Sequence, residues 1–96
     1  MRTSRFYKKQ ELWFLTFPMA FLNDDMPGHL IMLLQDDHNA HSFHGLKIPF
    51  AFLRENRTKF DVRAGGEKFD LHISGKKSKW MIDLRSQGID FSKFII

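Results

Sequence analysis

Two aspartates and three histidines lie within nine residues, at positions 36 to 44. Asp36 and Asp37 precede His38, His41 and His44, whose imidazoles recur at intervals of three residues. Carboxylate and neutral imidazole are the usual ligands of Zn²⁺ and similar ions where cysteine is absent, as it is here. The segment therefore predicts a metal site or, because histidine titrates near neutrality, an acid–base site. The alternative, which we favour, is a solvated polar loop, because the HExxH pattern of metalloproteases is missing.

Basic residues form a second set of candidates, and they belong to the C-terminal half of the chain. Residues 1–44 carry a net charge of −1 and residues 45–96 carry +5. This excess of positive charge predicts an anionic partner, either nucleic acid (DNA or RNA) or an acidic protein surface. The candidate contacts are Arg54, Arg57, Lys59, Arg63, Lys68, Lys76, Lys77, Lys79 and Arg85, with Trp80 as a residue that could stack on a base.

Phenylalanine is unusually frequent, with 11 among 96 residues, which is more than a small core needs. Some of these rings are expected on the surface, where they would suit a protein partner as well as stacked bases. The leading hypothesis is a small, non-catalytic module that binds nucleic acid through a C-terminal helix and β-meander. The second is a protein-interaction, inhibitor or regulatory module. The third is a small metal-dependent enzyme that uses residues 36–44 and needs a homodimer interface to form a cleft.

Length and motifs exclude several other classes of protein. A chain of 96 residues can bury one core, so residues 1–96 are expected to form a single domain. The absence of cysteine excludes disulfides, and the sequence has no glycine-rich phosphate loop and no nucleophile elbow. The apolar stretch 12–22 is interrupted by Pro18 and is too short to span a bilayer. We expect no membrane partner, no secretory signal and a cytoplasmic location.

The hydropathy pattern predicts the elements that position these candidates. Two short apolar runs, residues 12–17 and 29–35, predict strands; the first is expected to be buried on both faces and the second to be central in a sheet. Residues 36–46 are polar and predict a loop. A helix is predicted over 49–59, beginning at a proline and carrying Asn56 on its apolar face.

The clearest pattern is a β-hairpin. Apolar residues alternate with polar ones over 60–64 and 69–73, on either side of a Gly-Gly turn. The register that keeps the apolar residues on one face also sets two aspartates against each other, although the diagonal neighbours have opposite charge. The predicted pairs are Ala64 with Glu67, Val62 with Phe69, Phe60 with Leu71 and Asp61 with Asp70.

A turn over 75–79 precedes a third predicted strand, in which Trp80, Ile82 and Leu84 face the core. We therefore predict an α+β fold: a small, mostly antiparallel sheet of about five strands with one helix, in the order β-β-α-β-β-β. A small, partly open β-barrel with one helix is the alternative, because short strands can curl to hide their edges.

Overall fold

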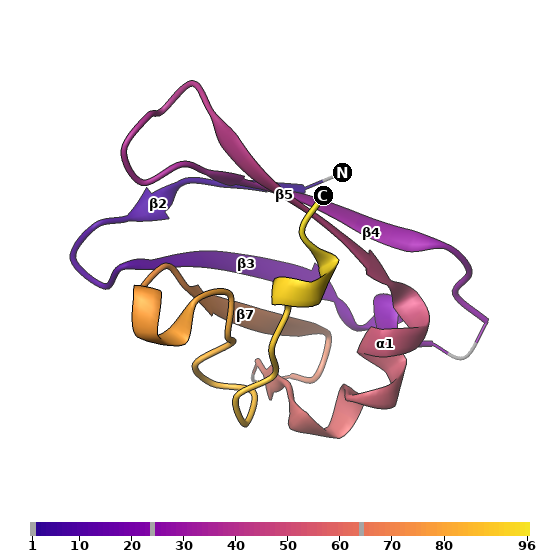
Figure 1. The fold of residues 1–96 in the computed structure, drawn as a ribbon. Coiled ribbons are helices and arrows are strands. Elements are labelled where there is room, and N and C mark those ends of the chain that lie inside the picture. The colour runs from indigo at the N-terminus through magenta and orange to yellow at the C-terminus, as the bar shows by residue number, and fades with distance from the viewer. Residues whose placement is uncertain (1, 24, 64) are drawn as a thin grey trace.

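The computed structural model describes residues 2–23, 25–63 and 65–96. Figure 1 shows the longer strands of this part of the chain in two layers, with the helix at one end. The strands are β1 (Arg2–Ser4), β2 (Phe6–Tyr7), β3 (Leu12–Pro18), β4 (His29–Gln35), β5 (Phe43–Pro49), β6 (Asp61–Val62) and β7 (Lys68–Ser74), and the α-helix is α1 (Phe50–Glu55). Short 3-10 helices are η1 (Met19–Leu22), η2 (Arg57–Lys59), η3 (Lys77–Lys79) and η4 (Ser92–Phe94).

The strands belong to two sheets, with the orders β1-β4-β5 and β2-β3-β7-β6. Every pair is antiparallel except β1 with β4, so the predicted α+β class and its mostly antiparallel pairing are confirmed. The strands form two sheets instead of the one predicted, because the chain leaves the first sheet after β1 and enters the second at β2. Five strands therefore precede the helix. Over the described residues, the sheets do not close into a barrel.

Apolar side chains from both sheets meet between the layers. In β3, Trp13, Leu15 and Phe17 are buried, whereas the residues between them are only half-buried. The prediction that residues 12–17 are buried on both faces is therefore wrong. The strand has one core face and one outer face, as expected for an antiparallel sheet that packs on one side only. The outer face of β3 is part of the candidate site described below.

The first sheet contains two strands that the sequence did not predict, β1 and β5. β4 coincides with the predicted strand 29–35 and lies at the centre of its sheet, as expected. β5 begins at residue 43, inside the predicted loop, so the loop is limited to residues 36–42. Leu46 and Ile48 are buried while Lys47 is exposed, which is the alternation of a strand.

Gly45 hides this alternation in the sequence, because glycine is depleted in strands. Its role in the fold is to let the C-terminus approach β5. The backbone N–H of Ile96 donates to the carbonyl of Gly45 at 2.9 Å, and Ile95 bridges to Leu46. A Cβ atom added at Gly45 would lie 2.9 Å from a side-chain carbon of Ile96, so a larger residue would displace the C-terminus.

The predicted helix over 49–59 is present but is interrupted after Glu55. Pro49 has the extended backbone of a residue that precedes a helix, with φ −60° and ψ 135°. Asn56 ends α1, because its side-chain Nδ2 donates to the carbonyl of Phe52 at 2.9 Å and its backbone leaves helical geometry. The polar residue predicted on the apolar face therefore ends the helix.

The hairpin register is confirmed over the described residues. The observed pairs are Asp61 with Asp70 and Val62 with Phe69. Nε of Arg63 donates to both carboxylate oxygens of Asp70, at 2.9 and 3.1 Å, so the diagonal attraction offsets the like-charge pair. Val62 is nevertheless exposed, and β6 is too short to pair Phe60. The predicted pair that includes Ala64 lies outside the described residues.

In the predicted third strand, the side chains that face the core are not the ones that the sequence predicted. Backbone hydrogen bonds do join residues 81–84 to β7, but they form isolated bridges and no continuous strand. Met81 and Asp83 are fully buried, whereas Leu84 is exposed and Trp80 is half-buried. Met81 has a φ of 61°, in the left-handed region, which turns the chain and reverses the alternation.

Candidate nucleic-acid interface

The outer face of the second sheet carries aromatic side chains on three neighbouring strands. Tyr7 on β2 pairs with Leu12 on β3, and Phe14 on β3 pairs with His72 on β7. Because alternate residues of a strand point to one face, these side chains all lie on the side away from the core. The rings of Phe14 and His72 have centroids 4.9 Å apart and are inclined by 60°. A regular sheet thus holds half-buried rings at a surface; we call this the aromatic face (Tyr7, Phe14 and His72).

Two rings of the aromatic face lie next to a guanidinium group. Cζ of Arg5 is 4.9 Å from the ring centroid of Tyr7, and Cζ of Arg63 is 5.8 Å from that of Phe14. Both distances are within the range of cation–π contacts, about 6 Å. The ion pair with Asp70 holds Arg63 in this position. The aromatic face therefore combines stacking surfaces with positive charge.

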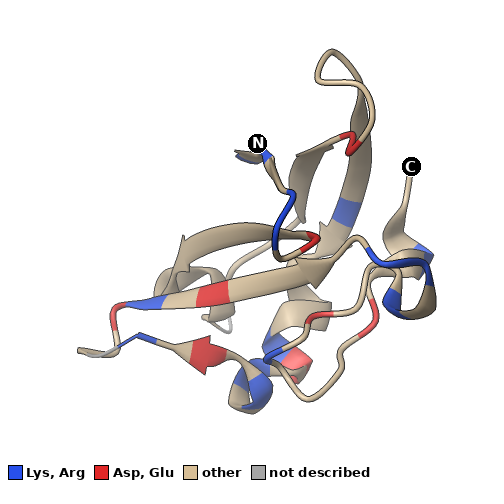
Figure 2. Ribbon diagram, turned by 90° about the vertical axis from the view of Figure 1, so that its left-hand side faces the viewer, with Lys and Arg blue, Asp and Glu red and all other residues tan. Residues whose placement is uncertain are grey.

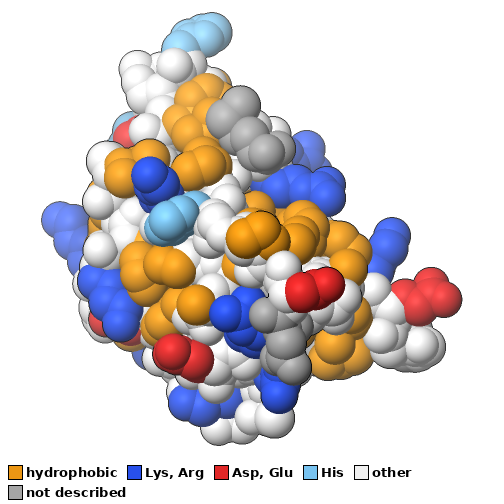
Figure 3. Space-filling view, turned by 90° about the vertical axis from the view of Figure 1, so that its right-hand side faces the viewer, with side chains coloured by type: hydrophobic (Ala, Val, Ile, Leu, Met, Phe, Trp, Pro, Cys, Tyr) orange, Lys and Arg blue, Asp and Glu red, His pale blue; other side chains and the backbone are white. Residues whose placement is uncertain are grey.

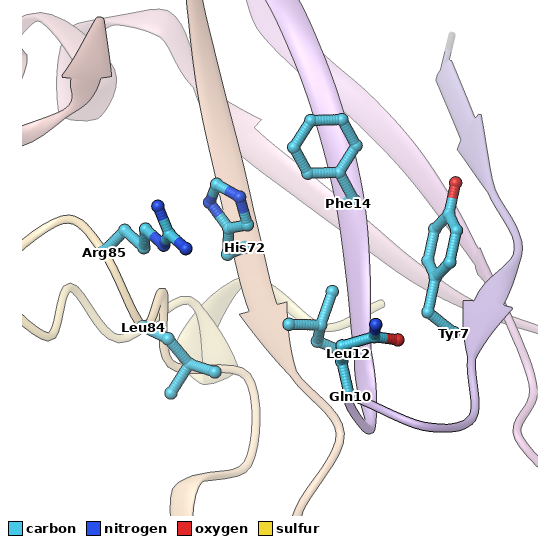
Figure 4. Close-up of a pocket in the computed structure, with 7 residues that line it drawn as sticks. All are labelled: Tyr7, Gln10, Leu12, Phe14, His72, Leu84 and Arg85. Carbon is cyan, nitrogen blue, oxygen red and sulfur yellow. The ribbon is translucent and has the colours of Figure 1, made fainter.

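A pocket of about 390 Å³ opens on this face. Figure 4 shows Phe14 and His72 side by side on neighbouring strands, with Tyr7 on one flank and Arg85 on the other. Most of the lining is apolar, with a small number of polar groups, which is typical of ligand sites. The lining residues are Tyr7, Gln10, Leu12, Phe14, His72, Leu84 and Arg85.

One wall of the pocket depends on the loop that follows β7. The buried side chain of Asp83 accepts hydrogen bonds from the backbone N–H groups of His72 and Arg85, at 3.3 and 3.0 Å. It also accepts one from the hydroxyl of Ser86 at 2.7 Å. The side chain of Arg85 is 66% exposed, and its Nη1 lies 4.0 Å from Oδ2 of Asp61. Such an exposed ion pair is weak, so the Arg85 side chain can turn toward an anionic ligand.

The basic residues predicted from the sequence are distributed over three regions. Arg63 and Arg85 lie at the aromatic face, and Lys68 points to the same side of β7. Lys76, Lys77 and Lys79 lie at or beside η3, and Arg54, Arg57 and Lys59 lie on α1 and η2. Figure 2 shows these basic segments separated along the ribbon, with acidic positions between them.

Several of the predicted basic residues have partners within the fold. Nη1 of Arg54 donates to the carbonyls of Asn23 and Met26, at 3.4 and 3.0 Å, and so holds the loop before β4. Nζ of Lys76 lies 3.8 Å from the carboxylate of Glu11. The contacts of Arg54 support the fold and require no ligand, whereas the exposed ion pair of Lys76 is weak.

Trp80, the predicted base-stacking residue, packs at the margin of the core. Its ring meets Trp13 and His44 edge to face, with centroids 5.8 and 5.2 Å apart. Both contacts occupy parts of a ring that is only half-exposed. Trp80 therefore lies on the core side of β3, away from the aromatic face, and its base-stacking role stays a prediction.

Most of the phenylalanine side chains lie in the core or pack against it. Among the residues that the structure describes, Phe43 is the only phenylalanine in the exposed class, with 49% of its surface accessible. Figure 3 shows the side that carries α1 and the start of β4, where lysine and arginine side chains are dispersed among hydrophobic ones. Nine of the eleven phenylalanines are buried or pack against the core, and Phe14 and Phe43 are the rings that lie at the surface, where some were expected.

The structure brings only three of the five predicted metal ligands in residues 36–44 close together. Ligand atoms of Asp36, Asp37 and His44 lie within 4.8 Å of one another, and all three residues are half-buried. His38 and His41 are exposed and do not belong to this group. Carboxylate and imidazole are ligands that Zn²⁺ accepts, so a metal site at these three residues, and a metal-dependent enzyme built on it, stay hypotheses.

Asp36 instead organises the loop between β4 and β5. Its Oδ1 accepts hydrogen bonds from the backbone N–H groups of His38 and Asn39, at 2.7 and 3.0 Å. Its Oδ2 lies 3.3 Å from Nε2 of His44, within ion-pair range but without the alignment of a hydrogen bond. The N–H of His38, followed by that of Asn39, lowers the pKa of Asp36 below its ordinary value of 3.8, although burial opposes this.

We expect this carboxylate to stabilise the fold only above the acidic range. A carboxyl group whose pKa is lower in the folded state contributes stability above its unfolded value, about 3.9, and loses it as the pH falls through the folded value. The difference in the free energy of unfolding between the wild type and Asp36→Ala should therefore shrink as the pH is lowered from 6 to 3. Urea unfolding at several pH values measures it, and a difference that is constant with pH would contradict the assignment.

Sequence reasoning missed the residues that form the centre of the site. Tyr7 lies in a two-residue strand with no periodic signal, and Phe14 lies in an apolar run in which every side chain looks buried. His72 occupies a polar position of the correctly predicted hairpin, so its outward direction was available from the alternation. The missing information was that β2 pairs with β3 and that β3 pairs with β7, which only the fold supplies.

The fold and the site define a small α+β protein with two open sheets, one of which presents an aromatic face with a pocket. Comparisons with protein-family models, curated proteins and solved structures gave no match. No helix within the described residues has the length and apolar character needed to cross a membrane.

Proposed function

We propose that this protein is a non-catalytic module that binds single-stranded nucleic acid on its aromatic face. The observation that carries the proposal is the combination of Tyr7 and Phe14 with a guanidinium group over each ring. Proteins that bind single strands combine aromatic side chains, on which bases stack, with positive charge that follows the backbone. The net charge of +4 favours the approach of such a ligand.

The form of the face favours a single strand over a duplex. Stacking requires bases whose faces are accessible, and paired bases in a duplex present only their edges to a protein. The described residues offer a sheet surface and a pocket here, and the one α-helix, six residues long, lies elsewhere in the fold. A protein partner is the alternative, and it would depend less on salt because few counterions are released.

Fluorescence anisotropy with labelled single-stranded and duplex oligonucleotides tests the proposal. If Arg5 and Arg85 each neutralise one phosphate, the logarithm of the affinity for a single strand should fall with that of the salt concentration with a slope of about −1.4. Affinity should then fall roughly 7-fold between 50 and 200 mM salt. Duplex DNA of equal length should bind more weakly. The proposal fails if no single strand binds at 50 mM salt.

Variants identify the surface that binds. Arg5→Gln and Arg85→Gln should each reduce the salt slope by about 0.7, the value for one phosphate contact on a single strand. Lys47→Gln, which removes an exposed charge from the other sheet, is the matched control and should leave the slope unchanged. Loss of affinity in Lys77→Gln and Lys79→Gln alone would move the interface to the η3 turn.

A further inference from the structure

Five lysines lie in two turns at one end of the second sheet. The first turn joins β2 to β3 over residues 8–11, and the second leads from β7 into η3 over residues 75–79. The backbone N–H of Gly75 donates to the carbonyl of Glu11 at 2.9 Å, so the two turns are in contact. Figure 1 and Figure 2 show both turns at the same end of the sheet. We call these lysines the basic edge (Lys8, Lys9, Lys76, Lys77 and Lys79).

The basic edge accounts for the net positive charge of the chain. The two turns contain five lysines and one acidic residue, Glu11, which gives them a net charge of +4. The whole chain also has a net charge of +4, from 15 basic and 11 acidic residues, so the other residues carry ten charges of each sign. Charge of one sign gathered in one place attracts a ligand of opposite charge and speeds its association.

Four of these lysines have side chains that no other part of the fold engages. All five are exposed, and Nζ of Lys76 lies 3.8 Å from the carboxylate of Glu11. Within residues 2–23, 25–63 and 65–96, the other four side chains have no ion pair and no hydrogen bond. These four are Lys8, Lys9, Lys77 and Lys79. Their amino groups are therefore available to the phosphates of a nucleic acid, which release counterions when lysine neutralises them.

The basic edge adjoins the pocket on the aromatic face. Tyr7 and Gln10 line the pocket, and they flank the two lysines of the first turn in the chain. Leu12, which also lines the pocket, pairs with Ser74 just before the second turn. A strand that is bound at Tyr7 and continues past Gln10 therefore meets the basic edge.

We infer that the sugar–phosphate backbone of a longer single strand continues from the aromatic face over the basic edge. The inference rests on the proposed function, because both surfaces bind the same ligand. The aromatic face holds a few bases by stacking, and the basic edge holds the phosphates that follow them. Affinity and its salt dependence should therefore increase with the length of the strand, whereas binding at the aromatic face alone would be complete with a short strand.

The test compares oligo(dT) strands of about five and about fifteen nucleotides by fluorescence anisotropy, within the range of site sizes of single-strand-binding domains. The shorter strand covers only the aromatic face and should show the slope of about −1.4 that two phosphate contacts give. The longer strand should gain about 0.7 for each of the four available lysines, so its slope should be about −4.2. Its affinity should fall roughly 300-fold between 50 and 200 mM salt. Equal slopes for the two strands would overturn the inference and leave the proposed function intact.

Two double variants, one in each turn, locate the contacts. Lys8→Gln with Lys9→Gln should reduce the slope for the longer strand by about 1.4, the value for two phosphate contacts. Lys77→Gln with Lys79→Gln should have the same effect. Neither double variant should change the slope for the shorter strand. A wild-type slope for the longer strand in both double variants would overturn the inference.

The matched control is Lys47→Gln with Lys59→Gln, which removes the same charge from exposed positions on β5 and η2. Both of its slopes should keep their wild-type values. If the control lowers the slope as much as the other double variants do, the effect is one of net charge and the inference is overturned. Poly-glutamate that binds as tightly as the longer strand would also overturn it, because the basic edge would then suit an acidic protein. Absence of binding to either strand would instead overturn the proposed function.

Discussion

Asp83→Ala is expected to lower the free energy of unfolding by about 2–4 kcal/mol, because it leaves several buried hydrogen-bond donors without an acceptor. The side chain of Asp83 is fully buried and accepts hydrogen bonds from two backbone N–H groups and from the hydroxyl of Ser86. An alanine side chain can replace none of these bonds. Urea unfolding followed by tryptophan fluorescence measures the loss.

Two variants separate the loss of hydrogen bonds from a general effect of substitution. Asp83→Asn keeps one carbonyl oxygen for the backbone N–H groups, and the hydroxyl of Ser86 can rotate to accept from the new amide, so its cost should be about 1 kcal/mol or less. Asp90→Ala removes an exposed aspartate that accepts from the N–H of Ser92 at 2.8 Å, and it should cost about 0.5–1 kcal/mol. If Asp83→Ala costs no more than Asp90→Ala, then Asp83 does not hold the loop.

The same substitution should also affect the pocket. Asp83 holds the backbone of Arg85, and Leu84 next to it donates its N–H to the carbonyl of His72 at 2.9 Å. When Asp83 is lost, the wall formed by residues 84 and 85 is no longer tied to β7 by this side chain. A buried aspartate in the C-terminal loop therefore supports the candidate interface without touching its ligand.

Local patterns predicted the parts of the fold that local interactions decide. The hairpin register follows from the alternation over 60–73, and the start of the helix follows from Pro49, whose ring fixes φ. The remaining strands depend on pairing with strands that are distant in the sequence. Residues 2–7 become strands because β4 and β3 pair with them, and residue 43 extends a sheet whose partner, Gln35, lies on the far side of a polar loop.

The residues of the candidate site also could not be predicted from local sequence patterns alone. The excess of basic residues predicted an anionic ligand. The net charge of a segment, however, does not show which of its residues lie on the same surface. Arg54 holds a loop and Trp80 lies at the margin of the core, whereas Arg63 lies over Phe14. Such assignments depend on whether a strand is covered on one face or on both, which no single strand reveals.

Phe14→Ala is expected to reduce the affinity for single-stranded DNA by roughly 5- to 150-fold, since stacking of one base on an aromatic side chain contributes about 1–3 kcal/mol. The ring is half-buried on the outer face and lies between His72 and the guanidinium of Arg63. The substitution removes no charge, so the salt slope should keep its wild-type value. Phe43→Ala, which truncates an exposed ring on the other sheet, should bind as the wild type does.

Phe14→Leu then shows whether the ring acts as an aromatic or merely as an apolar surface. Leucine retains much of the buried area against His72 but cannot offer a flat π-face to a base. We expect its affinity to be closer to that of Phe14→Ala than to that of the wild type, with a urea midpoint near the wild-type value. If Phe14→Leu binds single strands as tightly as the wild type, stacking does not provide the affinity. The surface would then be an apolar contact, and a protein partner would be the better explanation of the aromatic face.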